Sequence, residues 1–241
     1  MPDQRRHRGP HPDDLGLFAP AAWPTLRDAA ADFVWLLNRR YAPDSALKLV
    51  GDRHGLVARQ RIAVARCTCN DASAERRRQR EVPMAALAGR PLWIDGYNAL
   101  TTVEAALAGG IILAARDGTF RDMASMHGSY RKVQETRTAL KLLGGVLAAA
   151  GVSQSVWLLD RPVSNSGRLK QLMELLAAEC GWTWRIELSA NPDAVLIQSA
   201  EIVATADSVI LDRCAAWFNL ARVTIREKVP EARVTDFGNV Q

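Results

Sequence analysis

The chain has 241 residues, of which 48% are hydrophobic, and it carries a formal net charge of +5. A chain of this length and composition can bury one sizeable core and a smaller second one. No apolar run approaches the roughly 20 uncharged residues of a membrane span, and the arginine-rich start lacks the apolar stretch of a signal peptide. These features exclude a membrane protein, and we expect a globular, cytoplasmic protein.

The positive charge is concentrated in the N-terminal part. Residues 1–90 contain 16 Lys and Arg against 10 Asp and Glu, whereas residues 91–241 contain 15 against 16. Such a surplus suits attraction to the phosphate backbone of a nucleic acid, although a run of solvated surface charges has the same composition.

Residues 1–22 are rich in Pro, Arg, His and Asp and have no periodic apolar pattern, which predicts a disordered tail. Residues 23–84 predict a small all-α domain that is basic. Apolar residues at three- and four-residue steps indicate helices over about 25–40, 43–50 and 56–67. The polar, arginine-rich stretch 70–81 then reads as a linker to a domain boundary near residue 85.

The second and third predicted helices are joined by a short turn with glycine at both ends, Gly51 to Gly55. This is the outline of a helix-turn-helix, and it fits nucleic-acid contact and plain helix packing equally well. Under the first interpretation, Arg53, Arg59 and Arg61 contact RNA or DNA phosphates.

Residues 90–241 predict an α/β domain with a mainly parallel sheet flanked by helices, because strand-like and helix-like runs alternate. The expected strands are 92–95, 111–115, 155–159 and 182–188, and the expected helices include 129–150 and 168–179. The stretch 109–118 predicts a hairpin with a turn at Asp117-Gly118, which could form a lid.

Three apolar runs in this domain each end in an aspartate: Asp95, Asp160 and Asp207. An aspartate in such a place can simply cap the helix that follows. Three of them favour a site, because parallel strands bring their carboxyl ends to one edge of the sheet. Asp193 follows Pro192 at the start of a predicted helix and points toward the same edge.

These four carboxylates predict a site for Mg²⁺ or Mn²⁺, which prefer hard oxygen ligands from separate chain segments. Gathering the carboxylates without a cation would cost heavily in repulsion and desolvation. A bound ion can activate water and stabilise charge on a phosphate, so the expected reaction is phosphodiester hydrolysis.

Other side chains have expected roles around this site. Asn98 could orient the water or the phosphate, and Arg131 and Lys132 on the predicted helix 129–150 could hold the substrate backbone. Glu135 on that helix either reaches the metal or pairs with Arg131 at the surface.

Several other classes of site are not supported by the sequence. No phosphate-binding loop of the Gly-x-x-x-x-Gly-Lys-Ser/Thr type occurs, and no Gly-x-Gly-x-x-Gly follows a strand. Cys67 and Cys69 lack a second cysteine pair or a histidine cluster, which argues against zinc. His127 is interpreted as a loop or packing residue.

The motif Leu92-Trp-Ile-Asp-Gly-Tyr-Asn-Ala-Leu100 resembles the opening strand of NYN-type members of the PIN-like nuclease superfamily, whose first acid is followed by Gly-Tyr-Asn. The runs ending in Asp160, Asp193 and Asp207 resemble the later acidic motifs of that superfamily. The resemblance covers about residues 90–227. The whole chain also resembles a prokaryotic family in which a small helical domain precedes this one.

The resemblance implies a PIN-like fold and a metal-dependent endoribonuclease. Asp95, Asp160, Asp193 and Asp207 would hold Mg or Mn, and Asn98 would join them as a catalytic residue. The alternatives are a nucleic-acid-binding protein that does not hydrolyse RNA, and a phosphatase for small substrates. The phosphatase is disfavoured because haloacid-type phosphatases have an aspartate at the position that Tyr97 occupies here.

The sequence departs from the superfamily pattern at one place. Asn191-Pro-Asp193 holds one acid where two are usual, and the interval to Asp207 is short for a helix plus a strand. In an alternative register, residues 208–211 form the strand and Asp212 is the site acid.

Overall fold

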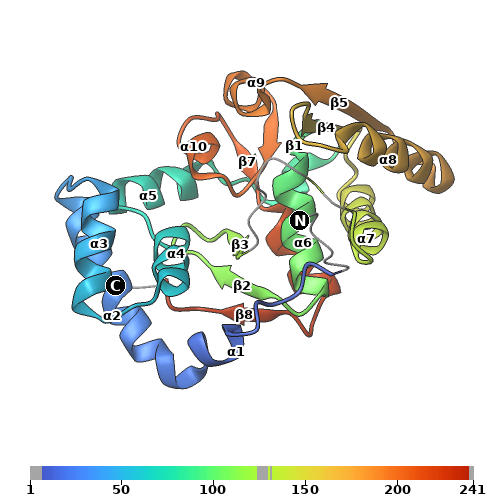
Figure 1. Ribbon diagram of the computed structural model, residues 1–241. Helices are drawn as coiled ribbons and strands as arrows, with labels where there is room; N and C mark the ends of the chain where they lie inside the picture. The colour runs from blue at the N-terminus through green and yellow to red at the C-terminus, as the bar shows by residue number, and fades with distance from the viewer. Residues whose placement is uncertain (1–6, 124–129, 131, 239–241) are drawn as a thin grey trace.

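A five-stranded parallel sheet with the strand order β5-β4-β1-β6-β7 forms the centre of the C-terminal part (Figure 1). The computed structural model describes residues 7–123, 130 and 132–238. It confirms the expected fold class, an α/β sheet flanked by helices and preceded by a helical region. The strands are β1 (Pro91–Asp95), β4 (Gln154–Asp160), β5 (Trp184–Ser189), β6 (Ile202–Ala204) and β7 (Trp217–Phe218).

Helices cover both faces of this sheet, because its central strands are apolar on both sides. On one face, Leu92 and Ile94 of β1 are buried in a core with residues of four helices, and on the other, Val156 and Leu158 of β4 pack with residues of two helices. The first face carries α6 (Gly96–Leu107), α7 (Thr136–Ala149), α8 (Ser166–Cys180) and α11 (Leu220–Lys228). The second face carries α9 (Pro192–Gln198) and α10 (Ser208–Leu211). Among the described helices, none is both long and apolar enough to cross a lipid bilayer.

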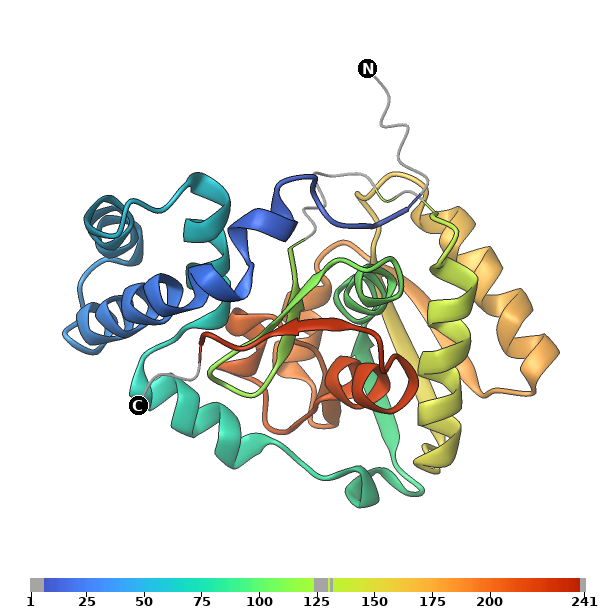
Figure 2. The ribbon, with the colours of Figure 1, turned by 90° about the horizontal axis from the view of Figure 1, so that it is seen from below.

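A second, three-stranded sheet lies between α6 and the N-terminal helices (Figure 2). It consists of the antiparallel hairpin β2 (Ile111–Ala114) and β3 (Phe120–Asp122), with β8 (Arg233–Thr235) parallel to β2. The predicted hairpin is confirmed, but the expected lid is wrong. Leu113 is fully buried and Asp117 in the turn is 4% exposed, because the hairpin is part of a core.

Helices α2 (Trp23–Asn38), α3 (Pro43–Arg53) and α4 (Ala58–Cys67) lie where the apolar spacing predicts them. The polar stretch read as a linker is instead the helix α5 (Asp71–Arg80), whose first turn is capped by the Asn70 side chain, which accepts a hydrogen bond from the Ser73 N–H at 2.8 Å. Short 3-10 turns flank this region at η1 (Pro20–Ala22) and η2 (Met84–Leu87).

The N-terminal helices complete their core with residues from the far end of the chain. Leu26 and Val64 pack in one cluster with Ile111 and Leu113 of β2 and with Phe237. The helical region therefore closes on the second sheet rather than on itself, and this contact brings the end of α4 close to the main sheet.

The expected disordered tail is wrong for its described part, residues 7–22. Helix α1 (Asp14–Leu17) forms there, and the buried Asp14 carboxylate pairs with Arg59 of α4. Arg8 forms an ion pair with the fully buried Glu104 of α6 at 2.5 Å. Composition alone could not reveal these ion pairs, because the partners lie far along the chain.

Candidate active site

Asp95 ends the central strand β1 and is also the N-cap of α6. One carboxylate oxygen accepts a hydrogen bond from the backbone N–H of Asn98 at 3.4 Å, and the other accepts one from the hydroxyl of Thr205 at 2.8 Å. Helix α6 can start directly after the strand because residue 96 is glycine. A Cβ there would lie 2.7 Å from the carbonyl oxygen of Leu158 on β4.

The loop after β6 is tied to the same edge of the sheet. Asn98 accepts a hydrogen bond from the backbone N–H of Ala206 at 2.8 Å, and the Thr205 hydroxyl accepts one from the N–H of Asp207 at 3.0 Å. Asp207 itself caps α10 by accepting hydrogen bonds from Val209 and Ile210. Asp95 and Asp207 thus have the capping role that their positions suggest, and they also lie at neighbouring strand ends.

The four predicted carboxylates influence one another electrostatically. Burial raises the pKa of Asp95, and together with the charges of Asp207 and Asp193 it outweighs the hydrogen bonds from Thr205 and Asn98, so that the pKa is about 7. Burial also raises the pKa of Asp193, with added contributions from Asp207 and Asp160. The pKa of Asp160 is raised by burial. The four acids lie at or after the carboxyl ends of β1, β4, β5 and β6, which are neighbours in the parallel sheet.

These four carboxylates form no ion pair with a cationic side chain within the described residues. In the same part of the chain, no three His, Cys, Asp or Glu side chains lie close enough together to hold a metal ion. Placing several of the four acids on one ion therefore requires movement of side chains or bridging water molecules.

Tyr97 is a site neighbour whose role the sequence did not indicate. Its ring packs on Tyr130 with centroids 5.2 Å apart, and its hydroxyl is buried without a hydrogen-bond partner in the described residues. Burial raises the pKa of Tyr97, and the negative charge of Asp160 raises it further, so the phenol lies near that carboxylate.

Asp212 is not part of this group. Residues 208–211 form the helix α10 rather than a strand, which contradicts the alternative register. The Asp212 carboxylate pairs with Arg77 at 2.8 Å and with Arg76 at 3.0 Å. Burial opposes its ionisation, but these two arginines outweigh burial and lower the pKa of Asp212.

Glu135 and Lys132 do not lie on a helix, because α7 begins at Thr136 and not near residue 129. Glu135 precedes the helix and pairs with His7 at 2.6 Å. Lys132 is exposed. Arg131 and His127 lie outside the described residues.

The three arginines predicted to bind nucleic acid are engaged within the N-terminal helices. Arg59 pairs with Asp14, and Arg61 pairs with Asp52 at 2.9 Å. Arg53 lies 3.5 Å from Asp32 and its side chain is 73% exposed. Arg59 and Arg61 therefore serve helix packing, and Arg53 retains an exposed side chain.

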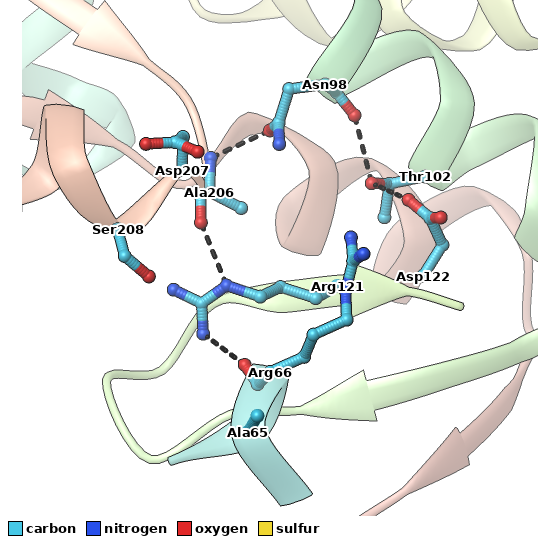
Figure 3. A pocket seen from close by; sticks show the side chains of 9 residues that line it. All are labelled: Ala65, Arg66, Asn98, Thr102, Arg121, Asp122, Ala206, Asp207 and Ser208. Atoms are coloured by element: carbon cyan, nitrogen blue, oxygen red, sulfur yellow. Dashed lines mark hydrogen bonds between the residues drawn. The ribbon is translucent and has the colours of Figure 1, made fainter. Parts of the chain in front are cut away.

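A pocket of about 270 Å³ adjoins the carboxyl edge (Figure 3). Its lining includes Asn98 and Thr102 of α6, Asp207, and Arg66 near the end of α4. Arg66 belongs to the same basic stretch as Arg59 and Arg61, whose composition suits attraction to phosphate backbones.

Known families match both parts of the chain. A family model described as "Protein of unknown function (DUF434)" matches residues 25–80. The protein described as "Uncharacterized protein MJ0935" of Methanocaldococcus jannaschii is 29% identical over 191 residues, which are 78% of this chain and 89% of that protein. No solved structure matches the chain. A second family model matches residues 84–223, more than half of the chain, and the chain therefore belongs to the family described as "Domain of unknown function (DUF5616)".

Proposed function

We propose that this protein is a metal-dependent ribonuclease that hydrolyses phosphodiester bonds of RNA. The supporting observation is the gathering of Asp95, Asp160, Asp193 and Asp207, from four chain segments, at the carboxyl edge of one parallel sheet. The pKa values of Asp95, Asp160 and Asp193 are raised, which indicates that protein groups compensate the negative charges there poorly. A divalent cation would supply that compensation.

The donors fit Mg²⁺ or Mn²⁺ in their chemistry, because all four are carboxylates. Magnesium usually keeps several water molecules and needs only one or two carboxylates, so a ready group of three ligands is not required. Asp95 and Asp207 would hold the ion, since they lie at adjacent strand ends. When bound, the ion would activate water and stabilise charge on the phosphate.

The protein's own groups have separate tasks in this proposal. Asn98 is held by its bond to the Ala206 N–H, which leaves its amide nitrogen available to donate to a phosphate oxygen or to water. Thr205 orients the Asp95 carboxylate through a hydrogen bond of 2.8 Å. The edge is therefore prepared to position a phosphodiester beside carboxylates.

The test is cleavage of labelled single-stranded RNA in the presence of Mn²⁺. We expect cleavage that EDTA abolishes and that falls by about 100-fold or more in Asp95→Asn. Asp71→Asn is the matched control, because the Asp71 side chain is 65% exposed and pairs with Arg116 away from the site, and it should retain activity as a folded protein. Equal activity of Asp95→Asn and wild type would refute the proposal.

A nucleic-acid-binding protein without hydrolytic activity is the second candidate. The observation that favours it is the lack, within the described residues, of three metal-ligating side chains close enough to share an ion. In the same experiment, salt-sensitive RNA binding without cleavage would support this candidate instead.

A further inference from the structure

Arg66 connects the N-terminal helical region to the candidate site. Its side chain extends from α4 into the pocket beside the carboxyl edge, where Asn98 and Asp207 also line the wall (Figure 3). The pocket is therefore shared between the two parts of the chain that the two family models match separately.

The half-buried Arg66 has no ion-pair partner within the described residues, unlike Arg59 and Arg121. Its Nε is buried and forms no hydrogen bond within the described residues. By contrast, Arg59 pairs with Asp14, and Arg121 pairs with Asp117 at 2.6 Å. Buried polar groups are normally hydrogen-bonded, and a guanidinium stays charged and presents its donors in a planar fork suited to phosphate. Arg66 is thus arranged to receive an anion.

Arg121 holds Arg66 in this place. One nitrogen of Arg121 donates to the backbone carbonyl of Arg66 and another to the carbonyl of Ala206, both at 2.9 Å (Figure 3). The end of α4 and the loop leading to Asp207 are therefore fixed to one side chain. This makes Arg121 a positioning residue for the pocket.

Neutral hydrogen-bond donors lie in the same pocket as the Arg66 guanidinium. The Asn98 amide nitrogen remains available because its oxygen accepts from Ala206, and the Ser208 hydroxyl lies on the wall. The nearby Asp122 carboxylate accepts a hydrogen bond from Thr102 at 2.9 Å. The pocket thus offers donors to an anion directly beside the carboxylates of the edge.

We propose that Arg66 binds a backbone phosphate of the RNA strand adjacent to the phosphate that is cleaved. This inference rests on the proposed function. An RNA strand whose cleaved phosphate lies at the carboxyl edge carries its next phosphate about one nucleotide away, and we place that next phosphate beside Arg66. The helical region then takes part in substrate binding through this pocket rather than through its outer surface.

The test measures binding of a short fluorescein-labelled single-stranded RNA by anisotropy at several salt concentrations. All variants carry Asp95→Asn, so that the strand stays intact. Arg66→Met should weaken binding by about tenfold and reduce the slope of log K against log salt by about 0.7, the value for one phosphate contact on a single strand. Arg66→Lys should keep the slope, because it keeps the charge.

Arg90→Met is the matched control. Arg90 is 51% exposed and precedes β1, so it lies at the opposite end of that strand from the site. An equal loss in Arg66→Met and Arg90→Met, or an unchanged salt slope in Arg66→Met, would overturn the proposal. Displacement of the RNA by adenosine monophosphate at similar concentrations would overturn it as well, because it would indicate a mononucleotide site. Thermal unfolding checks that each variant is folded.

The two proposals can fail separately. If the strand binds with an Arg66-dependent slope but the wild type does not cleave it, hydrolysis is refuted and the role of Arg66 stands. If the wild type cleaves RNA and Arg66→Met leaves KM unchanged, the role of Arg66 is refuted and hydrolysis stands.

Discussion

Asp95 places a titratable carboxyl at the centre of the sheet edge at a cost to stability. An ordinary aspartate has a pKa near 3.9, whereas burial and the neighbouring acids raise that of Asp95 to about 7. The folded state therefore holds this proton more tightly than the unfolded state. The loss of stability caused by ionising Asp95 is absent below the pKa of aspartate in the unfolded chain. It grows as the pH rises and is complete above about pH 7.

We therefore expect Asp95→Asn to stabilise the protein at about pH 8 without metal, by on the order of 4 kcal/mol. Asparagine caps a helix as well as aspartate, so the start of α6 is preserved. At about pH 4 the two proteins should have nearly the same midpoint of thermal unfolding. A variant that is no more stable than the wild type at pH 8 would contradict the raised pKa.

Metal addition gives an independent prediction at the same residue. An ion that binds the folded state stabilises it, and its charge relieves the repulsion among the carboxylates. Mg²⁺ or Mn²⁺ at pH 8 should raise the unfolding midpoint of the wild type and leave that of Asp95→Asn nearly unchanged. An equal rise in both proteins would indicate an ion bound elsewhere.

At the scale of elements, the junction between β1 and α6 depends on Gly96. A Cβ at this position would lie 2.6 Å from Cδ2 of Leu159 and 2.7 Å from the carbonyl oxygen of Leu158. The leucine side chain can move, but the strand carbonyl cannot move without loss of sheet geometry. Gly96→Ala should lower the free energy of unfolding by about 1–3 kcal/mol in urea titrations.

Gly145 provides the matched control for this prediction. It lies in α7, and a Cβ there would meet nothing within 4 Å. Since alanine is the better helix former, Gly145→Ala should stabilise by up to about 1 kcal/mol. The two identical substitutions are expected to have opposite signs, and equal signs would contradict the close contact at Gly96.

The same elements show what the sequence could and could not predict. The strand that ends at Asp95 and the early helices follow from apolar periodicity, which is a local signal. Helix α5 was read as a linker because its stabilising partners are distant: Arg77 bonds to Asp117 and Asp212, 40 and 135 positions away. For the same reason Thr205, a partner of Asp95 110 positions away, was missed.

At the scale of the whole molecule, a buried ion-pair network joins the helical region to both sheets. Arg77 of α5 pairs with Asp117 in the β2–β3 turn at 2.7 Å and with Asp212 after α10 at 2.8 Å. Asp117 also pairs with Arg121, which fixes the pocket around Arg66. The Asp117 carboxylate therefore couples the packing of the helices to the geometry of the site.

Asp117→Asn should therefore affect both stability and RNA binding. Removing this charge leaves Arg77 and Arg121 buried and underpaired, which typically costs about 3–5 kcal/mol. Burial opposes ionisation of Asp117, but Arg121 and Arg77 outweigh it and lower its pKa. The ionised Asp117 carboxylate therefore stabilises the folded state at pH values above the pKa of an aspartate in the unfolded chain. This stabilisation is lost as the pH falls below that pKa.

Urea unfolding at neutral pH, compared with Asp71→Asn, tests this coupling. Asp71 also pairs with an arginine, Arg116, but its side chain is 65% exposed, so its loss should change the unfolding free energy much less. Because Asp117→Asn releases Arg121, it should also weaken RNA binding at temperatures where the protein remains folded, whereas Asp71→Asn should not. Unchanged RNA affinity in a destabilised Asp117→Asn protein would show that the network supports the fold alone, and that Arg66 keeps its position without Arg121.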